Sequence, residues 1–291
     1  MEILQLTVSG LANGCIYGLI ALGFVLIYKA TEQVNFAQGD MMMLGAFLAL
    51  GLGNSDWLGM PFLVACAGAV AGMAAVGWSM ERLVLRRIFG QSQVAVVILT
   101  IALGFVLRFV AGLVWGHEPL SLENPLAGSN ARFAGLVLGI DEIAVIVVTL
   151  LLTGLLFVFF NRSRLGVAMQ ASSQNQLAAY YMGIPVRRIH GLTWALAGAI
   201  AGIAGILFAT KGSIDPSAGL LGIKAFAAAV IGGFGSLPGA LLGGLLVGLS
   251  EPFAARFIAA GYSQIIPYAL LIVVLLLRPQ GLFSQVMGKK D

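Results

Sequence analysis

The chain has 291 residues, of which 59% are hydrophobic and 10% are charged, and its formal net charge is +4. Soluble domains carry about 25% charged residues, so this chain cannot cover a water-facing surface and is predicted to be an integral membrane protein. The sequence has no basic cluster with interleaved aromatic residues, which excludes nucleic acid as a partner. Cys15 and Cys66 lie in apolar runs and are interpreted as core thiols, not as a disulfide or metal site.

Apolar stretches follow one another along the chain. A helix needs about 20 residues to cross the hydrocarbon core. The long candidates are 3–28, 60–80, 94–116, 136–160, 190–210, 238–257 and 263–277. The shorter stretches 41–53 and 222–236 reach only about 20 Å and are interpreted as short or half-crossing helices. The chain begins with "MEILQL", which lacks the basic residues of a signal peptide, so we expect the first stretch to be retained as a span.

These elements predict an all-α, polytopic integral membrane protein. The count is about 8–10 transmembrane or half-membrane helices, arranged as one membrane domain over 1–291.

A polar interruption follows directly on the first apolar stretch, between Lys29 and Asp40. Polar groups at membrane depth are costly and usually face a bundle interior or a water path. The sequence therefore predicts a broken helix, with a new helix starting near Met41 and Asp40 or Gln38 as its N-cap. Contact of Asn35, Gln38 and Asp40 with a passing solute is the alternative interpretation.

A second segment, Lys211–Ser236, repeats this layout. In both places a long helix ends in a lysine, an aspartate follows in a polar stretch, and a short helix of small residues comes next. Asp215-Pro216 reads as an N-cap with proline at the first helical position. Paired interrupted segments are typical of a transport path built on internal inverted repeats, although two ordinary loops would give the same pattern. The candidates for the path or its gate are Asn35, Gln38, Asp40, Asp215 and Lys224.

Basic residues concentrate in particular connections. They lie at 82–87, at 162–188 and near the C-terminus. The positive-inside rule assigns these regions to the cytoplasmic side. Few basic residues occur in the other connections: 54–59, 117–135 and 211–221 together contain only Arg132 and Lys211. If 41–53 crosses the membrane, which is the favoured interpretation, the N-terminus lies outside, and if this stretch only dips into the membrane, the N-terminus lies inside. The residues behind this assignment are Arg82, Arg86, Arg87, Arg162, Arg164, Arg187, Arg188, Arg278, Lys289 and Lys290.

The longest predicted cytoplasmic connection, about 161–189, contains a helical pattern. Between Leu165 and Met182 apolar residues recur at helical spacing, and Gly183 and Pro185 are stop signals. A helix lying on lipid headgroups is one interpretation. A docking helix for a soluble partner is the other, and it is favoured because the helix carries no basic residue.

Glycine spacing predicts close helix packing late in the chain. In "IGGFGSLPGALLGGLLVG", Gly235, Gly239 and Gly243 recur every four residues, and Gly244 and Gly248 form a second such pair. Small residues at this spacing let membrane helices approach closely. A glycine-lined wall of a permeation path is the alternative.

Enzyme motifs are missing from the sequence. "GGFGSLPG" lacks the lysine of a phosphate-binding loop, so the chain is not expected to bind ATP. His117 and His190 fall on opposite predicted faces of the membrane, which argues against zinc. Arg108, near the middle of 94–116, has no evident acidic partner and gives little support to a secondary transporter. A small-solute channel is a further rival, and no metal, cofactor or catalytic residue is predicted.

Three separated segments resemble one known family. "NGCIYGLIALGFVLIYKATEQVNFAQGDMMMLGAF" and "GIKAFAAAVIGGFGSLPGALLGGLLVG" are similar to the opening and late segments of the permease subunits of branched-chain amino acid ABC importers. The 161–189 connection resembles their cytoplasmic coupling segment. The matching positions there are Asn175, Ala178, Ala179, Gly183 and Ile184.

The resemblance implies a subunit of a larger importer in the bacterial cytoplasmic (inner) membrane. A second permease, favoured to be a paralogue, would form the translocation path with this chain. Two cytoplasmic ATPase subunits would bind the coupling segments and hold ATP and Mg²⁺, and a periplasmic binding protein would deliver the solute. Leucine, isoleucine and valine are the expected solutes, with urea, short amides or other amino acids as alternatives.

Overall fold

The structure is a computed structural model that describes residues 2–88, 92–125, 129–133, 136–258 and 260–283. Its long helices are α1 (Glu2–Thr31), α3 (Phe62–Leu83), α4 (Gln93–Trp115), α5 (Ile140–Arg162), α8 (Val186–Lys211) and α10 (Leu237–Phe257). Its shorter helices are α2 (Gln38–Gly53), α6 (Arg164–Gln174), α7 (Gln176–Tyr181), α9 (Leu221–Gly232) and α11 (Ile266–Leu277). Three 3₁₀ turns complete the helical part, namely η1 (Leu85–Arg87), η2 (Pro216–Leu220) and η3 (Ala260–Gln264).

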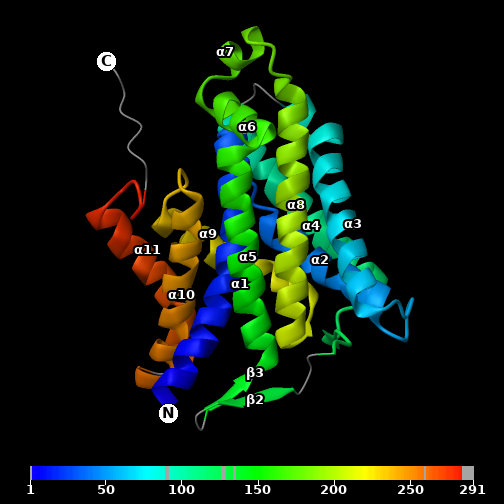
Figure 1. Ribbon diagram of the computed structural model, residues 1–291, viewed down its shortest axis with the longest axis vertical. Helices are drawn as coiled ribbons and strands as arrows, with labels where there is room; N and C mark the ends of the chain where they lie inside the picture. The colour runs from blue at the N-terminus through cyan, green and yellow to red at the C-terminus, as the bar shows by residue number, and fades with distance from the viewer. Residues whose placement is uncertain (1, 89–91, 126–128, 134–135, 259, 284–291) are drawn as a thin grey trace.

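The long helices form one bundle, with the N-terminus at one end and α6 and α7 at the other (Figure 1). By length and composition, six helices in the described ranges can cross a membrane, the second of them formed by α3 together with η1. The all-α, polytopic prediction is therefore confirmed. Two small antiparallel sheets are added, β1 (Leu120–Ser121) with β4 (Ser213–Ile214) and β2 (Asn130–Phe133) with β3 (Leu136–Gly139).

Two predicted spans have different bounds in the structure. The stretch 263–277 was expected to be a long helix, but α11 has only 12 residues. Part of its N-terminal side forms η3 instead, and Pro267 lies in the first turn of α11, where proline is tolerated. The stretch 136–160 begins with β3, so α5 starts four residues later than expected.

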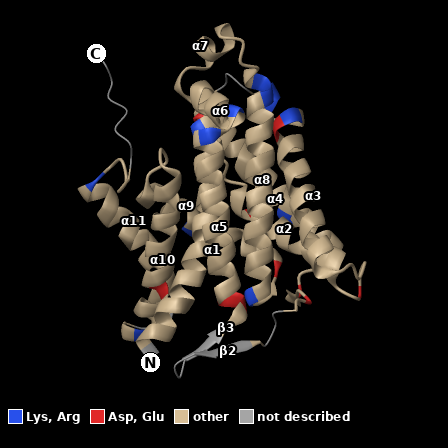
Figure 2. Ribbon diagram, viewed as in Figure 1, with Lys and Arg blue, Asp and Glu red and all other residues tan. Residues whose placement is uncertain are grey.

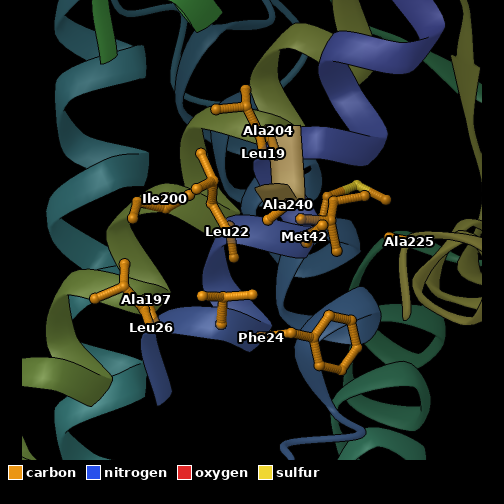
Figure 3. Close-up of a cluster of buried hydrophobic side chains, with 14 of the residues drawn as sticks. Leu19, Leu22, Phe24, Leu26, Met42, Ala197, Ile200, Ala204, Ala225 and Ala240 are labelled. Carbon is orange, nitrogen blue, oxygen red and sulfur yellow. The ribbon is translucent and has the colours of Figure 1, made fainter. Parts of the chain in front are cut away.

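The core lies around α1, α2 and α8. In the most apolar window of α1, 89% of the residues are buried, against 22% for α4 and for α5, so α1 is central and those two helices are peripheral. Figure 3 shows side chains from α1, α2, α8, α9 and α10 meeting in this core, with Leu19 and Leu22 beside Ile200 and Ala204. An apolar face on a peripheral helix is expected where lipid or another subunit covers it.

Two three-helix units, α1–α2–α3 and α8–α9–α10, pack on each other reciprocally. α1 packs against α10 and α8 packs against α3, so the first helix of each unit contacts the third helix of the other. The two short helices meet at Gly39 and Gly222, where a Cβ on either glycine would lie 2.6–2.7 Å from the Cα of the other. α1 and α8 run in opposite directions (Figure 1). This reciprocal, antiparallel packing is the arrangement that an inverted repeat produces.

Glycines set the closest helix approaches. A Cβ on Gly244 would overlap the backbone at Gly18, and one on Gly248 would overlap Gly14, so α10 and α1 are in backbone contact. Gly239 and Gly243 pack in the same way against α9, at Gly232 and Ala228. Gly235 does not take part in this packing. It lies before α10 begins, and a Cβ there would meet nothing within 4 Å.

Candidate transport path and coupling segment

The break after α1 is held by Asn35. Glu32 has φ 54°, a left-handed conformation that ends the helix. Asn35 Oδ1 accepts a hydrogen bond from the Ala37 N–H at 3.1 Å, and Asn35 Nδ2 donates to Gln38 Oε1 at 3.2 Å. α2 then begins at Gln38 without a side-chain cap bond. The expected capping by Gln38 or Asp40 is wrong, because the helix begins earlier than predicted and both residues lie inside its first turn.

Gln38 ties this break to α8. Its Nε2 donates to the carbonyl oxygen of Ala197 at 3.3 Å. Gly23 on α1 leaves space for the amide, since a Cβ there would overlap it. Asn35 and Gln38 are fully buried. In this conformation their polar groups are satisfied inside the bundle and stabilise the irregular backbone, as membrane depth requires.

Arg108 has an acidic partner after all, and the partner is Asp40. Arg108 Nη2 and Nε both donate to Asp40 Oδ1, at 2.8 Å and 3.1 Å. Two glycines make room for the pair, because a Cβ on Gly104 would overlap Asp40 Oδ2 and one on Gly219 would overlap Asp40 Oδ1. The pair therefore joins the start of α2 to α4 beneath η2, and Asp40 serves in an ion pair.

The second break follows α8 and contains the predicted cap. Asp215 Oδ1 accepts a hydrogen bond from the Ser217 N–H at 2.7 Å, and Pro216 occupies the first helical position. The turn that it caps is η2, after which α9 begins at Leu221. The capping role read from Asp215-Pro216 agrees with this geometry, and β4 pairs with β1 immediately before it.

Lys224 forms a second, partly buried ion pair, which sequence reasoning missed. Lys224 Nζ lies 2.8 Å from Glu251 Oε1 on α10, and the Tyr17 hydroxyl donates to Glu251 Oε2 at 2.7 Å. Both carboxylate oxygens are therefore occupied, and α1, α9 and α10 are linked. The available signal was an acid, Glu251, within a largely apolar helix whose other charged residue is Arg256 in the last turn.

The two breaks lie against each other inside the bundle. A Cβ on Gly39 would overlap the Gly219 carbonyl, so the first turn of α2 touches η2. Phe226 of α9 contacts Phe24 and Phe36, with ring centroids 5.6 Å and 5.1 Å apart. Of the candidate residues, Asp40 lies at this contact, beside Gly219, whereas Asp215 caps η2 and Lys224 pairs with Glu251 on α10.

The connection 161–189 forms two helices, where the sequence predicted one. Asn175 separates α6 from α7 in an extended conformation, and its Oδ1 accepts the Ala178 N–H at 2.9 Å. The prediction of one helix over 165–182 is wrong because this asparagine caps a new helix. Gly183 has φ 81° and ends α7, as predicted, in a conformation that favours glycine.

The α7 surface differs from the one expected. Ala178 is exposed, but Ala179 is buried and accepts the Ile184 N–H at its carbonyl oxygen, at 3.0 Å. Ala179 therefore faces inward, and the side chains that project from this end are apolar and aromatic. They are Leu177, Tyr180, Tyr181 and Met182, the last two 78% and 83% exposed.

Basic residues gather at the same end as α6 and α7, where Figure 2 shows lysines and arginines near the helix ends. There Arg86 makes two bonds to the buried Glu81, at 2.7 Å and 3.1 Å, and a third to the Arg187 carbonyl at 3.3 Å. This link joins η1 and α3 to the start of α8. Lys289 and Lys290, which also supported the sidedness, lie outside the described residues.

No group of three or more His, Cys, Asp or Glu side chains in the described ranges could hold a metal ion. A bundle with two buried helix breaks, two internal ion pairs and a projecting helix pair defines a multi-pass membrane transport subunit. Residues 6–275 match the family model described as branched-chain amino acid transport system / permease component. The chain belongs to this family, and it is a permease subunit, not an enzyme.

Similar proteins cover almost the whole chain. It is 34% identical to the high-affinity branched-chain amino acid transport system permease protein BraD of Pseudomonas aeruginosa, over 97% of this chain and 96% of that protein. It is 32% identical to the permease protein LivH of the same kind of system in Salmonella typhimurium, with the same coverage. Among solved structures it is similar to PsaBC from Streptococcus pneumoniae in complex with Fab, with a TM-score of 0.48 and 18% identity over 96% and 93% of the two chains.

Proposed function

We propose that this chain is one of two permeases in a bacterial ABC importer of leucine, isoleucine and valine. The observation that carries the proposal is the family match over residues 6–275. Two relatives with nearly complete coverage are named as permeases of branched-chain amino acid systems, which supports the same solute class. The expected location is the cytoplasmic (inner) membrane.

The α6–α7 pair is proposed as the coupling segment that docks a cytoplasmic ATPase. Tyr180, Tyr181 and Met182 are exposed apolar or aromatic side chains beyond the ends of the long helices. Aromatic residues and methionine are enriched at protein interfaces. In this role Asn175 and Gly183 fix the bounds of α7, Ala178 lies on its surface, and Ala179 with Ile184 anchors it to the bundle. The arginine-rich end is the cytoplasmic one by the positive-inside rule, and the C-terminus is assigned to the same side.

The remaining partners are assigned by family membership. A second permease, expected to be a paralogue, covers part of the apolar surface of the outer helices and completes the translocation path, and lipid covers the rest. Two ATPase subunits hold ATP and Mg²⁺, because this chain has no phosphate-binding loop. A periplasmic binding protein delivers the solute at the end opposite to α7.

The proposal is tested by affinity purification of the tagged chain from its native membrane, followed by reconstitution in liposomes. A second permease and an ATPase should copurify. The liposomes should import labelled leucine only with ATP inside and the loaded binding protein outside, and excess valine should compete. Import down a gradient by this chain alone would contradict the proposal and favour a channel.

A further inference from the structure

The Asp40–Arg108 pair leaves hydrogen-bonding capacity unused. Both bonds that Arg108 makes to Asp40 end on one oxygen, Oδ1. A guanidinium that engages a carboxylate fully makes two parallel bonds, one to each oxygen. Here Asp40 Oδ2 is directed toward Gly104, where a Cβ would overlap it. A ligand that carries both a donor and an acceptor can therefore engage the unused hydrogen-bonding groups of this pair.

The second ion pair of the bundle provides an internal comparison. Glu251 uses one oxygen for Lys224 and the other for the Tyr17 hydroxyl. All three polar groups come from helices of the core and satisfy one another. In that cluster both carboxylate oxygens have a partner, as expected for a purely structural contact. In the Asp40–Arg108 pair both bonds use one carboxylate oxygen, and the other is left for a further hydrogen bond.

The depth of Arg108 within α4 argues against lipid as the neighbour of its exposed side. The Arg108 side chain is 25% exposed, against 9% for Asp40. It lies on α4 seven residues before Trp115, about 10 Å inside the helix end at 1.5 Å per residue. Cationic side chains at such depth are costly against lipid and usually face a bundle interior or a water-filled cavity. The exposed side of Arg108 is therefore expected to face protein or a water-filled cavity.

We propose that Asp40 and Arg108 bind the zwitterionic backbone of the transported amino acid, an inference that rests on the proposed function. The ammonium group of the solute donates to Asp40 Oδ2, and its carboxylate accepts from the guanidinium N–H groups of Arg108. Both contacts are charge-assisted, and a planar guanidinium matches a carboxylate geometrically. The site binds the ammonium and carboxylate groups that all amino acids share, so it does not discriminate between their side chains.

Occupation of this site also acts on the helix breaks. Asp40 lies in the first turn of α2, and Gly219 of η2 lies against both members of the pair. When the solute takes over the charges of Asp40 and Arg108, it replaces the contact that holds α2 against α4. Binding of the solute thereby offsets the free energy needed to separate α2 from α4, between which the solute must pass.

The test uses the complete importer in liposomes and the double variant Asp40→Leu with Arg108→Met. Replacing a buried ion pair with apolar residues of similar volume is often neutral or stabilising, so a purely structural pair tolerates this change. We expect the variant complex to assemble and to melt like the wild type. Import of leucine and of valine should fall by the same factor, about tenfold or more, because two charged contacts are lost. Tyr17→Phe, which removes a buried hydrogen bond elsewhere, is the control for lost stability and should still import.

Each result has one meaning. Wild-type import rates in the double variant overturn the binding site and leave the proposed function intact. If the double variant does not assemble, Arg108→Lys replaces it, because lysine keeps the charge and loses the planar fork. An Arg108→Lys complex that melts normally and imports poorly supports the site, and one that imports like the wild type overturns it. If the wild-type complex imports no amino acid, the proposed function is wrong, and the proposed binding site is wrong as well.

Discussion

Tyr17 and Glu251 are 234 positions apart in sequence, yet the Tyr17 hydroxyl donates a 2.7 Å hydrogen bond to Glu251 Oε2. Lys224 pairs with the other oxygen of the same carboxylate at 2.8 Å. One acid therefore links α1, α9 and α10, the first helix of the chain and the last two of the second unit.

Glu251→Gln is expected to be destabilising because it leaves the partly buried Lys224 ammonium without a counter-charge. Breaking a fully buried pair in this way costs about 3–5 kcal/mol, which is an upper bound for this partly buried one. Tyr17→Phe should cost less, about 1.5–3 kcal/mol for one hydrogen bond to a charged group. Thermal unfolding of the purified protein in detergent measures both. Equal melting temperatures for Glu251→Gln and the wild type would show that the cluster does not hold the helices together.

Gly248→Ala tests the backbone contact between α10 and α1. The added methyl group would overlap the backbone at Gly14, so the helices must separate. Overpacking of this kind costs about 1–3 kcal/mol, and the folded yield should fall. Gly154→Ala in α5 is the matched control, because a Cβ there meets nothing within 4 Å. The control should gain about 0.5–1 kcal/mol from a better helix former, and identical behaviour of the two variants would refute the packing argument.

Gly183→Val is expected to uncouple ATP hydrolysis from solute. Gly183 has φ 81° at the end of α7, and a β-branched residue is strained in that region by about 1–2 kcal/mol. The strain should shift α7, so the loaded binding protein should stimulate ATP hydrolysis less than in the wild type. Gly183→Asn is the control, because asparagine tolerates this backbone conformation and should retain stimulation. If ATP hydrolysis by the Gly183→Val complex were fully stimulated, α7 would not be the coupling helix.

Cysteines at positions 35 and 38 report whether the first break opens to water. Both side chains are fully buried, so neither cysteine should react with a small aqueous thiol reagent in this conformation. The experiment needs a background without Cys15 and Cys66, and a cysteine at the exposed Ser217 is the reactive control. Labelling at position 35 or 38 that changes with trapped nucleotide would instead place these residues on the path.

The sequence predicted the features that depend on local patterns. The apolar lengths indicated the long helices, the polar run before Asp40 indicated a break, and Asp215-Pro216 indicated a capped turn. It could not reveal the partner of Arg108, because Asp40 lies 68 positions away and only the packing of α2 on α4 joins them. It also missed the division of the coupling segment at Asn175, since the apolar spacing continues through that residue and only the backbone conformation interrupts it.

The glycine pattern shows the same division between local and tertiary information. Spacing by four identified Gly244 and Gly248, but it also included Gly235, which lies in a turn with open space beside it. The surface facing Gly244 and Gly248 consists of Gly14 and Gly18 at the other end of the chain. Their role becomes recognisable only once α1 and α10 are known to be neighbours.

The reciprocal packing of α1–α2–α3 and α8–α9–α10 has a consequence for how the permease can move. Units of opposite orientation present similar surfaces to the two sides of the membrane, and Gly39 and Gly222 lie where the two short helices touch. If each unit adopts two shapes, exchanging the shapes between the units converts a state open to one side into a state open to the other. The small differences between the units, such as 16 residues in α2 against 12 in α9, then decide which of the two states is lower in energy at rest.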